Sequence, residues 1–203
     1  LSAASQKEVL LLWQGLGYNR RALFLHRAAQ EVVRRGGFPD TRDELMSLPG
    51  IGSYTAGAIR SFAYNQPECF LETNVRTVLI HHFFPRSRGI TDAQLMAVLT
   101  QCMSYVQSPR VWYSALMDYG TYLKRTFGNA SRKSATYSKQ SAFQGSRRQI
   151  RGAILRALSR TDATESALLS EHPFHEATVV TSVIGDLLTE GFIVKKKEKY
   201  SLR

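Results

Sequence analysis

The chain of 203 residues is poor in the features that mark membrane, disulfide-rich and metal-binding proteins. It has only two cysteines, Cys69 and Cys102, which lie far apart and without the spacing of metal ligands. Its five histidines form no ligand pattern either. No apolar run approaches the roughly 20 residues of a membrane-spanning helix, and no signal-peptide pattern opens the chain. We therefore expect a soluble cytoplasmic protein whose two cysteines are small buried apolar residues.

Acidic residues are scarce, and one long segment of the chain has none. The chain has 27 Lys and Arg against 16 Asp and Glu, a formal charge of +11, which favours a polyanionic partner. Residues 124–160 hold ten basic residues and no acid, with Tyr137 and Phe143 among them. Such a stretch is either a solvated linker or a phosphate-binding segment, and we expect phosphate contacts from it.

The apolar spacing predicts a mainly α-helical fold in two parts. The first part, residues 1–127, reads as all helix. Residues 128–146 are polar, Ser-rich and basic, and without helical periodicity, which indicates a linker. The helices expected before the linker span residues 6–14, 18–35, 41–48, 53–65, 74–84, 91–106 and 108–125.

The last part, residues 147–203, has the pattern of a small winged-helix domain. Three apolar-periodic segments, 149–158, 164–169 and 176–189, are followed by an expected strand over 191–194, a charged turn over 195–198 and a returning strand over 199–202. Winged helices bind duplex DNA or dock proteins, and the four lysines of this hairpin favour DNA.

The most informative run is Leu-Pro-Gly-Ile-Gly-Ser-Tyr-Thr-Ala-Gly at residues 48–57, a Pro-Gly-x-Gly turn between two expected helices. Its glycines allow positive φ and leave bare amides at the start of the second helix, where the helix dipole favours an anion. A turn of this kind also joins ordinary helices. With DNA as the anion, it is a clamp for a backbone phosphate.

Five ordered blocks in residues 1–127 carry a resemblance to a known family. They are Trp-Gln-Gly-Leu-Gly-Tyr at 13–18, Leu-His-Arg-Ala-Ala at 25–29 after Arg21, the hairpin at 48–59, Leu-Glu-Thr-Asn-Val-Arg at 71–76, and Ala-Leu-Met-Asp-Tyr-Gly at 115–120. In order and nearly in spacing, they resemble the MutY-type adenine glycosylases of the helix-hairpin-helix DNA glycosylase superfamily. This resemblance implies excision of a base from DNA.

Glu72 and Asn74 fall where the family has its catalytic Asp-Gly-Asn-Val segment. Breaking an N-glycosidic bond requires an acid that protonates the departing base and a carboxylate that stabilises the oxocarbenium-like sugar and guides water. By resemblance Glu72 takes the carboxylate role, although it departs from the family's Asp by one methylene. Otherwise Glu72 is an acid beside a helix dipole and Asn74 a helix N-cap.

Tyr54 occupies the hairpin position that decides the reaction type in this superfamily. Bifunctional members place a Lys there to form a Schiff base with the sugar, which a Tyr cannot do. The resemblance therefore implies hydrolysis without an efficient lyase step, with Tyr54 lining the pocket of the flipped base. Its other interpretation is a partly buried helix tyrosine.

The resemblance also assigns DNA contacts and a structural ion. Tyr18 matches the residue that family members insert beside the lesion. The backbone carbonyls of Met46, Leu48 and Ile51 match those that hold a monovalent cation, Na⁺ or K⁺, beside the phosphate. The complete set of expected DNA-contacting residues, with the basic ones taken from the charge pattern, is Tyr18, Pro49, Gly50, Ile51, Gly52, Ser53, Thr55, Arg132, Lys133, Arg147 and Arg148.

Two family features have no counterpart in this sequence. Many members follow the Met-Asp-x-Gly helix with four cysteines that hold a [4Fe-4S] cluster, whereas residues 124–146 contain no cysteine. We therefore expect no iron–sulfur cofactor. The family's catalytic Glu lies on a helix that precedes the segment matching Leu1, and Glu8 is more simply a solvated helix acid. Because the first residue is not Met, we expect either that the sequence begins downstream of a natural start or that an N-terminal segment with this helix lies elsewhere.

These observations predict a mismatch-specific monofunctional DNA glycosylase of base-excision repair. Adenine opposite guanine or 8-oxoguanine, and thymine or uracil opposite guanine, remain equal candidates for the excised base, because a sister group that removes thymine or uracil also has a Tyr in the hairpin. The alternative is a non-catalytic DNA-binding or lesion-recruiting protein. We expect a monomer that acts on double-stranded DNA with a mismatch or lesion, associated with the nucleoid and not with a membrane.

Overall fold

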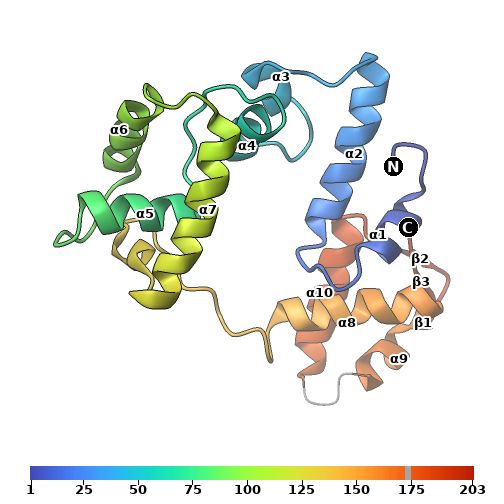
Figure 1. The fold of residues 1–203 in the computed structure, drawn as a ribbon. Coiled ribbons are helices and arrows are strands. Elements are labelled where there is room, and N and C mark those ends of the chain that lie inside the picture. The colour runs from blue at the N-terminus through green and yellow to red at the C-terminus, as the bar shows by residue number, and fades with distance from the viewer. Residues whose placement is uncertain (172–174) are drawn as a thin grey trace. The chain divides into compact units, whose positions relative to one another are not determined.

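The computed structural model describes residues 1–171 and 175–203, which form two compact units. One unit consists of Leu1–Arg34 together with Gln140–Arg203, and the other of Arg35–Lys139. Figure 1 shows the course of the chain through both. None of the described helices is long and apolar enough to cross a membrane. The mainly α-helical fold predicted from the sequence is confirmed.

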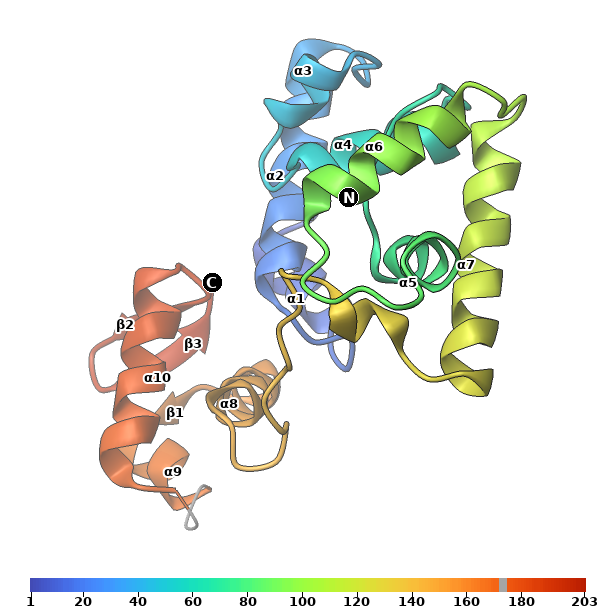
Figure 2. The same ribbon diagram turned by 90° about the vertical axis from the view of Figure 1, so that its left-hand side faces the viewer.

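The unit Arg35–Lys139 is built around helix α5 (Thr73–Phe83). Figure 2 shows α5 nearly end-on, flanked by α6, α7 and η1. Its core is apolar and includes the fully buried side chains of Ile80, Leu95 and Leu99. The other elements of this unit are α3 (Arg42–Met46), α4 (Ser53–Phe62), α6 (Asp92–Met103), α7 (Pro109–Thr126) and the 3-10 helix η1 (Ala130–Lys133).

The other unit combines two N-terminal helices with the C-terminal region. Its elements are α1 (Gln6–Leu12), α2 (Arg20–Arg35), α8 (Arg147–Arg160), β1 (Ala163–Thr164), α9 (Glu165–Ser170), α10 (Ala177–Thr189), β2 (Ile193–Lys196) and β3 (Lys199–Leu202). The strands form one antiparallel sheet in the order β1-β3-β2. Helix, helix, helix and hairpin follow in the expected order, and the assignment to the winged-helix class stays a prediction.

The two units divide the chain differently from the boundaries expected from the sequence. The expected parts were 1–127, 128–146 and 147–203, whereas α1 and α2 share a core with the C-terminal region. Leu10 and Leu23, which project from α1 and α2, are buried in the same cluster as Ile150 of α8 and Leu187 of α10. An apolar helix face is stable only when other apolar side chains cover it. The apolar faces of α1 and α2 are covered within this cluster, to which the C-terminal helices also belong. The three-part boundaries stay a prediction.

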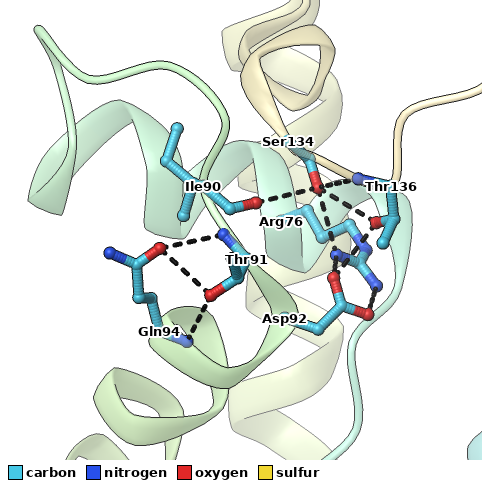
Figure 3. A network of polar contacts seen from close by, with 7 residues as sticks. All are labelled: Arg76, Ile90, Thr91, Asp92, Gln94, Ser134 and Thr136. Carbon is cyan, nitrogen blue, oxygen red and sulfur yellow. Dashed lines mark hydrogen bonds and ion pairs between the residues drawn. The ribbon is translucent and has the colours of Figure 1, made fainter.

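Within the segment expected as a linker, 128–146, residues 130–136 contain the 3-10 helix η1 and make polar contacts with α5 and α6; the linker assignment stays a prediction. After η1, Ser134 forms a bridge with Ile90, and Thr136 reaches Asp92 at the start of α6. Figure 3 shows how Arg76 of α5 joins this network through Asp92. Because these bonds are made by polar side chains, they leave no apolar periodicity in the sequence.

Candidate functional site

The hairpin between α3 and α4 has the backbone geometry that its glycines predict. Gly50 has φ +76°, in the left-handed region that side chains disfavour. Gly52 is the N-cap of α4 and provides no side-chain cap. The first amide groups of α4 therefore have no acceptor from the cap residue, and they lie at the positive end of a helix dipole, where an anion such as a phosphate is favoured.

A network of charged side chains braces this hairpin. Glu68 pairs with Arg42 of α3 and, at 2.6 Å, with Arg60 of α4, and the Glu68 side chain is only 14% exposed. Arg42 also donates to the Ser53 hydroxyl at 2.6 Å. The two helices of the hairpin are thereby tied to the segment that leads into α5. Ser53 and Gly52 are exposed, while Thr55 is half-buried.

The three carbonyls expected to hold a cation all lie on this hairpin. The Leu48 carbonyl accepts one hydrogen bond from the Ile51 amide at 3.2 Å, which leaves it a second lone pair. Carbonyl oxygens are suitable ligands for a hard cation. The donor set therefore fits a monovalent cation, and the site at Met46, Leu48 and Ile51 stays a proposal.

Tyr54 is held at the start of α4 by aromatic packing. Its ring meets Phe70 edge to face, with ring centroids 5.6 Å apart, and Phe70 stacks on Tyr113 at 4.1 Å. The Tyr113 hydroxyl donates to the Glu68 carbonyl at 2.8 Å and accepts the Phe70 amide at 3.3 Å. Burial raises the pKa of Tyr113. Tyr54 itself keeps 48% of its surface exposed.

Glu72 forms the N-cap of α5. Burial and, second, the negative charge of Glu72 raise the pKa of Tyr54. The Glu72 carboxylate accepts the Asn74 backbone amide. The N-cap of α5 is therefore Glu72 and not Asn74, so the N-cap interpretation of Asn74 was wrong. The carboxylate is half-buried at the positive end of a helix.

The side chain of Asn74 points toward α7. Its Oδ1 accepts from Lys124 Nζ at 2.7 Å, and its Nδ2 lies 3.8 Å from the Met117 sulfur. Gly120 makes this close approach possible, because a Cβ there would lie 2.6 Å from the Asn74 carbonyl oxygen. Lys124 is the residue that sequence reasoning missed at this site. The available signal was its spacing of four from Gly120, which puts both residues on one face of α7.

Tyr54, Glu72 and Asn74 are thus brought together in one unit, whereas Tyr18 belongs to the other. Tyr18 has φ +49° and is 60% exposed. Its hydroxyl accepts from Gln140, and the Arg21 guanidinium lies 5.5 Å from its ring centroid. Glu8 serves as the acid of a capping box with Ser5 at the start of α1, in agreement with a helix-terminal role.

Of the four basic residues expected on DNA, three have internal partners. Lys133 donates to the Pro85 carbonyl at 2.6 Å, Arg147 pairs with Asp186 at 2.7 Å, and Arg148 donates to the Ser141 carbonyl at 2.7 Å. Arg132 is exposed and has no polar partner among the described residues. Of the four side chains, that of Arg132 is therefore the most available to bind a phosphate.

The cysteines do not fit an iron–sulfur cluster, which takes four thiolates. Both cysteines are free and half-buried, and the Thr100 hydroxyl lies 3.7 Å from the Cys69 sulfur. No group of three or more His, Cys, Asp or Glu side chains that could hold a metal occurs among the described residues.

Comparisons with known proteins place the hairpin in a recognised motif. The helix-hairpin-helix motif matches residues 35–62. Three similar proteins are all named adenine DNA glycosylase: from Mycolicibacterium smegmatis, 30% identical over 82% of this chain and 64% of that protein; from Buchnera aphidicola subsp. Baizongia pistaciae, 32% over 61% and 36%; and from Arabidopsis thaliana, 48% over 39% and 13%. The chain thus spans between an eighth and two thirds of their lengths.

Proposed function

We propose that this chain, which is a MutY-like member of the helix-hairpin-helix DNA glycosylases, is a mismatch-specific monofunctional glycosylase of base-excision repair. The observation that carries the proposal is that the N-terminus of α4 has no side-chain cap and is open to an anion, while the Glu72 carboxylate caps α5 in the same unit. A phosphate held at that end of α4 brings the neighbouring sugar toward the carboxylate.

Glu72 supplies the charge that the reaction requires. As the glycosidic bond breaks, positive charge develops on the sugar, and a fixed carboxylate stabilises it more strongly in a partly buried site than in water. The bond from the Asn74 amide fixes the orientation of that carboxylate. Asn74, held by Lys124, completes the polar wall. Protonation of the departing base requires a second acid, which the resemblance places ahead of the segment matching Leu1.

Tyr54 favours hydrolysis over a lyase step. Its ring packs edge to face against Phe70, and a phenol forms no Schiff base with the sugar. With a raised pKa the hydroxyl stays protonated at neutral pH and can donate a hydrogen bond to the sugar or the flipped base.

Adenine is the excised base that the relatives favour, because those proteins are named adenine DNA glycosylase; guanine or 8-oxoguanine opposite it is our own proposal. Thymine or uracil opposite guanine remains the competing choice, since a tyrosine at this hairpin position selects no base by itself. We further propose a monomer that acts on duplex DNA in the cytoplasm at the nucleoid, with a monovalent cation at the hairpin and no iron–sulfur cluster.

A non-catalytic DNA-binding protein is the second candidate function. The observation that favours it is that Glu72 already caps α5 and has a longer side chain than the family's Asp. A carboxylate devoted to its own helix contributes stability rather than chemistry. Such a protein would keep the hairpin clamp and recognise a mismatch without releasing a base.

Base release from defined duplexes tests these proposals. The chain, both alone and with any N-terminal extension recovered, is incubated with duplexes that contain A opposite 8-oxoguanine, A opposite G, T opposite G or U opposite G, and abasic sites are then cleaved with alkali. Alkali-dependent strand breaks in one duplex identify a glycosylase and its base. Breaks without alkali, together with borohydride trapping, contradict the monofunctional assignment. Salt-sensitive binding without any break leaves the non-catalytic protein.

A further inference from the structure

The unit Leu1–Arg34 with Gln140–Arg203 contains a cavity of about 630 Å³ that the proposed chemistry does not use. Tyr54, Glu72 and Asn74 are not among its lining residues. The walls come from the loop before α2, from the start of α2, from α8 and from the segment ahead of α8. This volume lies within the usual range for sites that enclose a small molecule, about 300 to 1,000 Å³.

The lining is aromatic and apolar at its base and rim. Leu155, 7% exposed, forms part of the base, while Phe24 and Phe143, 41% and 62% exposed, stand at the rim together with Tyr18. Exposed aromatic rings on a soluble protein are costly to leave in water, and rings of this kind form stacking surfaces for nucleic-acid bases.

The charge of the cavity is strongly positive. Five arginines and one acid line it. Glu190, the acid, is bonded by both Arg20 and Arg151 and offsets one of their two positive charges. The other cations are not paired with a carboxylate of the described residues: Arg148 donates to backbone carbonyls, and Arg21 lies over the rings of Trp13 and Tyr18.

Arg156 is the most accessible of these cations. It lies on α8, is exposed, and has no polar partner among the described residues. An unpaired guanidinium beside an aromatic cavity matches a ligand that has both a flat ring and a phosphate, because the rings stack on the base and the fork of donors binds the phosphate oxygens.

We propose that this cavity binds one unstacked nucleotide of the bound DNA, other than the nucleotide whose base is excised, with its base between Phe24 and Phe143 and its phosphate at Arg156. The inference rests on the DNA-binding half of the proposed function and not on its chemistry. An acidic peptide with an aromatic side chain is the competing occupant, and it requires no unstacking of DNA.

The test places 2-aminopurine, which fluoresces when unstacked, at successive positions of both strands of a duplex with A opposite 8-oxoguanine. With the full chain bound, one position other than the mispaired adenine should brighten severalfold. Phe143→Ala and Arg156→Gln should remove that signal. Each removes an exposed side chain, so both should fold normally. In binding titrations Phe143→Ala should weaken affinity roughly fivefold to a hundredfold, and Arg156→Gln should lower the salt slope by about one.

Matched controls separate the cavity from general surface effects. Arg160→Gln removes the same charge one turn along α8, and Phe38→Ala removes an exposed ring, but neither residue lines the cavity. Both should keep the signal. The inference is overturned if no position other than the mispaired adenine brightens on bound duplex, or if the controls lose the signal as fully as the cavity variants.

Base release measured on the same samples distinguishes this inference from the proposed function. Brightening without base release would support the cavity assignment and overturn the glycosylase, whereas base release without brightening would do the reverse. Failure to bind the duplex even at low salt overturns both.

Discussion

Gly120 lies too close to α5 to accept a side chain without movement. A Cβ at this position would lie 2.6 Å from the carbonyl oxygen and 2.7 Å from the Cβ of Asn74. Because both atoms belong to the start of α5, Gly120→Ala must push α5 and α7 apart. We expect a loss of about 1–3 kcal/mol in the free energy of unfolding, measured by urea denaturation.

Gly185→Ala is the control for this substitution. Gly185 lies inside α10, and a Cβ there would meet no atom within 4 Å. Alanine should therefore raise stability by about 0.5–1 kcal/mol through its higher helix propensity. Equal stability of the two variants would contradict the close contact between α5 and α7.

The electrostatic effect of Glu72 on Tyr54 can be measured at the residue scale. The Glu72 charge contributes, after burial, to the raised pKa of Tyr54. Glu72→Gln removes that charge, so the pKa of Tyr54 should fall toward the ordinary 10.0 while burial keeps it above that value. NMR titration of tyrosines labelled at Cζ measures the shift, and an unchanged pKa would show that the carboxylate lies elsewhere.

At the scale of elements, the Arg76–Asp92 pair fastens α5 to α6 and to the segment after η1 (Figure 3). The hydrogen bond from Arg76 lowers the pKa of Asp92 below its ordinary 3.8, with smaller help from Thr136. The stability that the pair provides is therefore present above pH 3.8 and is lost as pH falls through the lower folded pKa.

Asp92→Asn tests this linkage. Because the Asp92 side chain is 45% exposed, the variant should lose only about 1 kcal/mol or less at neutral pH. The difference from the unaltered chain should shrink progressively below pH 3.8. Asp118→Asn, which removes an exposed acid without a polar partner among the described residues, is the control. A difference that is constant in urea denaturation over this pH range would rule out the ionic contribution.

Most helices were predictable from the sequence because their apolar residues recur with helical spacing. Residues 53–65 were expected and α4 spans Ser53–Phe62; residues 176–189 were expected and α10 spans Ala177–Thr189. The final turn was placed too early, at 195–198, because lysines indicate a turn. In the structure Lys195 and Lys196 still pair with β3, and the turn lies at 197–198, where Lys197 has φ +54°. The two-residue β1 is too short for any periodic signal.

The local structure of the candidate site could be predicted from the sequence, but the contacts between its side chains could not. Glycines at the turn and an acid before α5 indicate a hairpin and a cap from local sequence alone. The partners of Asn74 and Arg147 depend on residues 50 and 39 positions away, which only the packing of helices brings near. Long-range polar pairs of this kind leave no mark on local sequence.

For the molecule as a whole, the charge of +11 predicts strongly salt-dependent binding to duplex DNA. Arg132→Gln should reduce the slope of log affinity against log salt by about one, because Arg132 is exposed and has no polar partner among the described residues. Arg147→Gln should change the slope less, since Arg147 already pairs with Asp186. Fluorescence anisotropy over a salt series measures the slope for each variant. Equal changes in slope would show that the pair with Asp186 does not keep Arg147 from binding a phosphate.

Glu72, on this proposal, performs chemistry beyond capping α5. The most direct measurement is single-turnover release of free adenine from a duplex with A opposite 8-oxoguanine, by the unaltered chain and by Glu72→Gln, each also with any N-terminal extension recovered. We predict that the variant binds the duplex with unchanged affinity and releases adenine at least about a hundredfold more slowly. Equal release rates, at equal affinity, would contradict the assignment of Glu72 as the catalytic carboxylate.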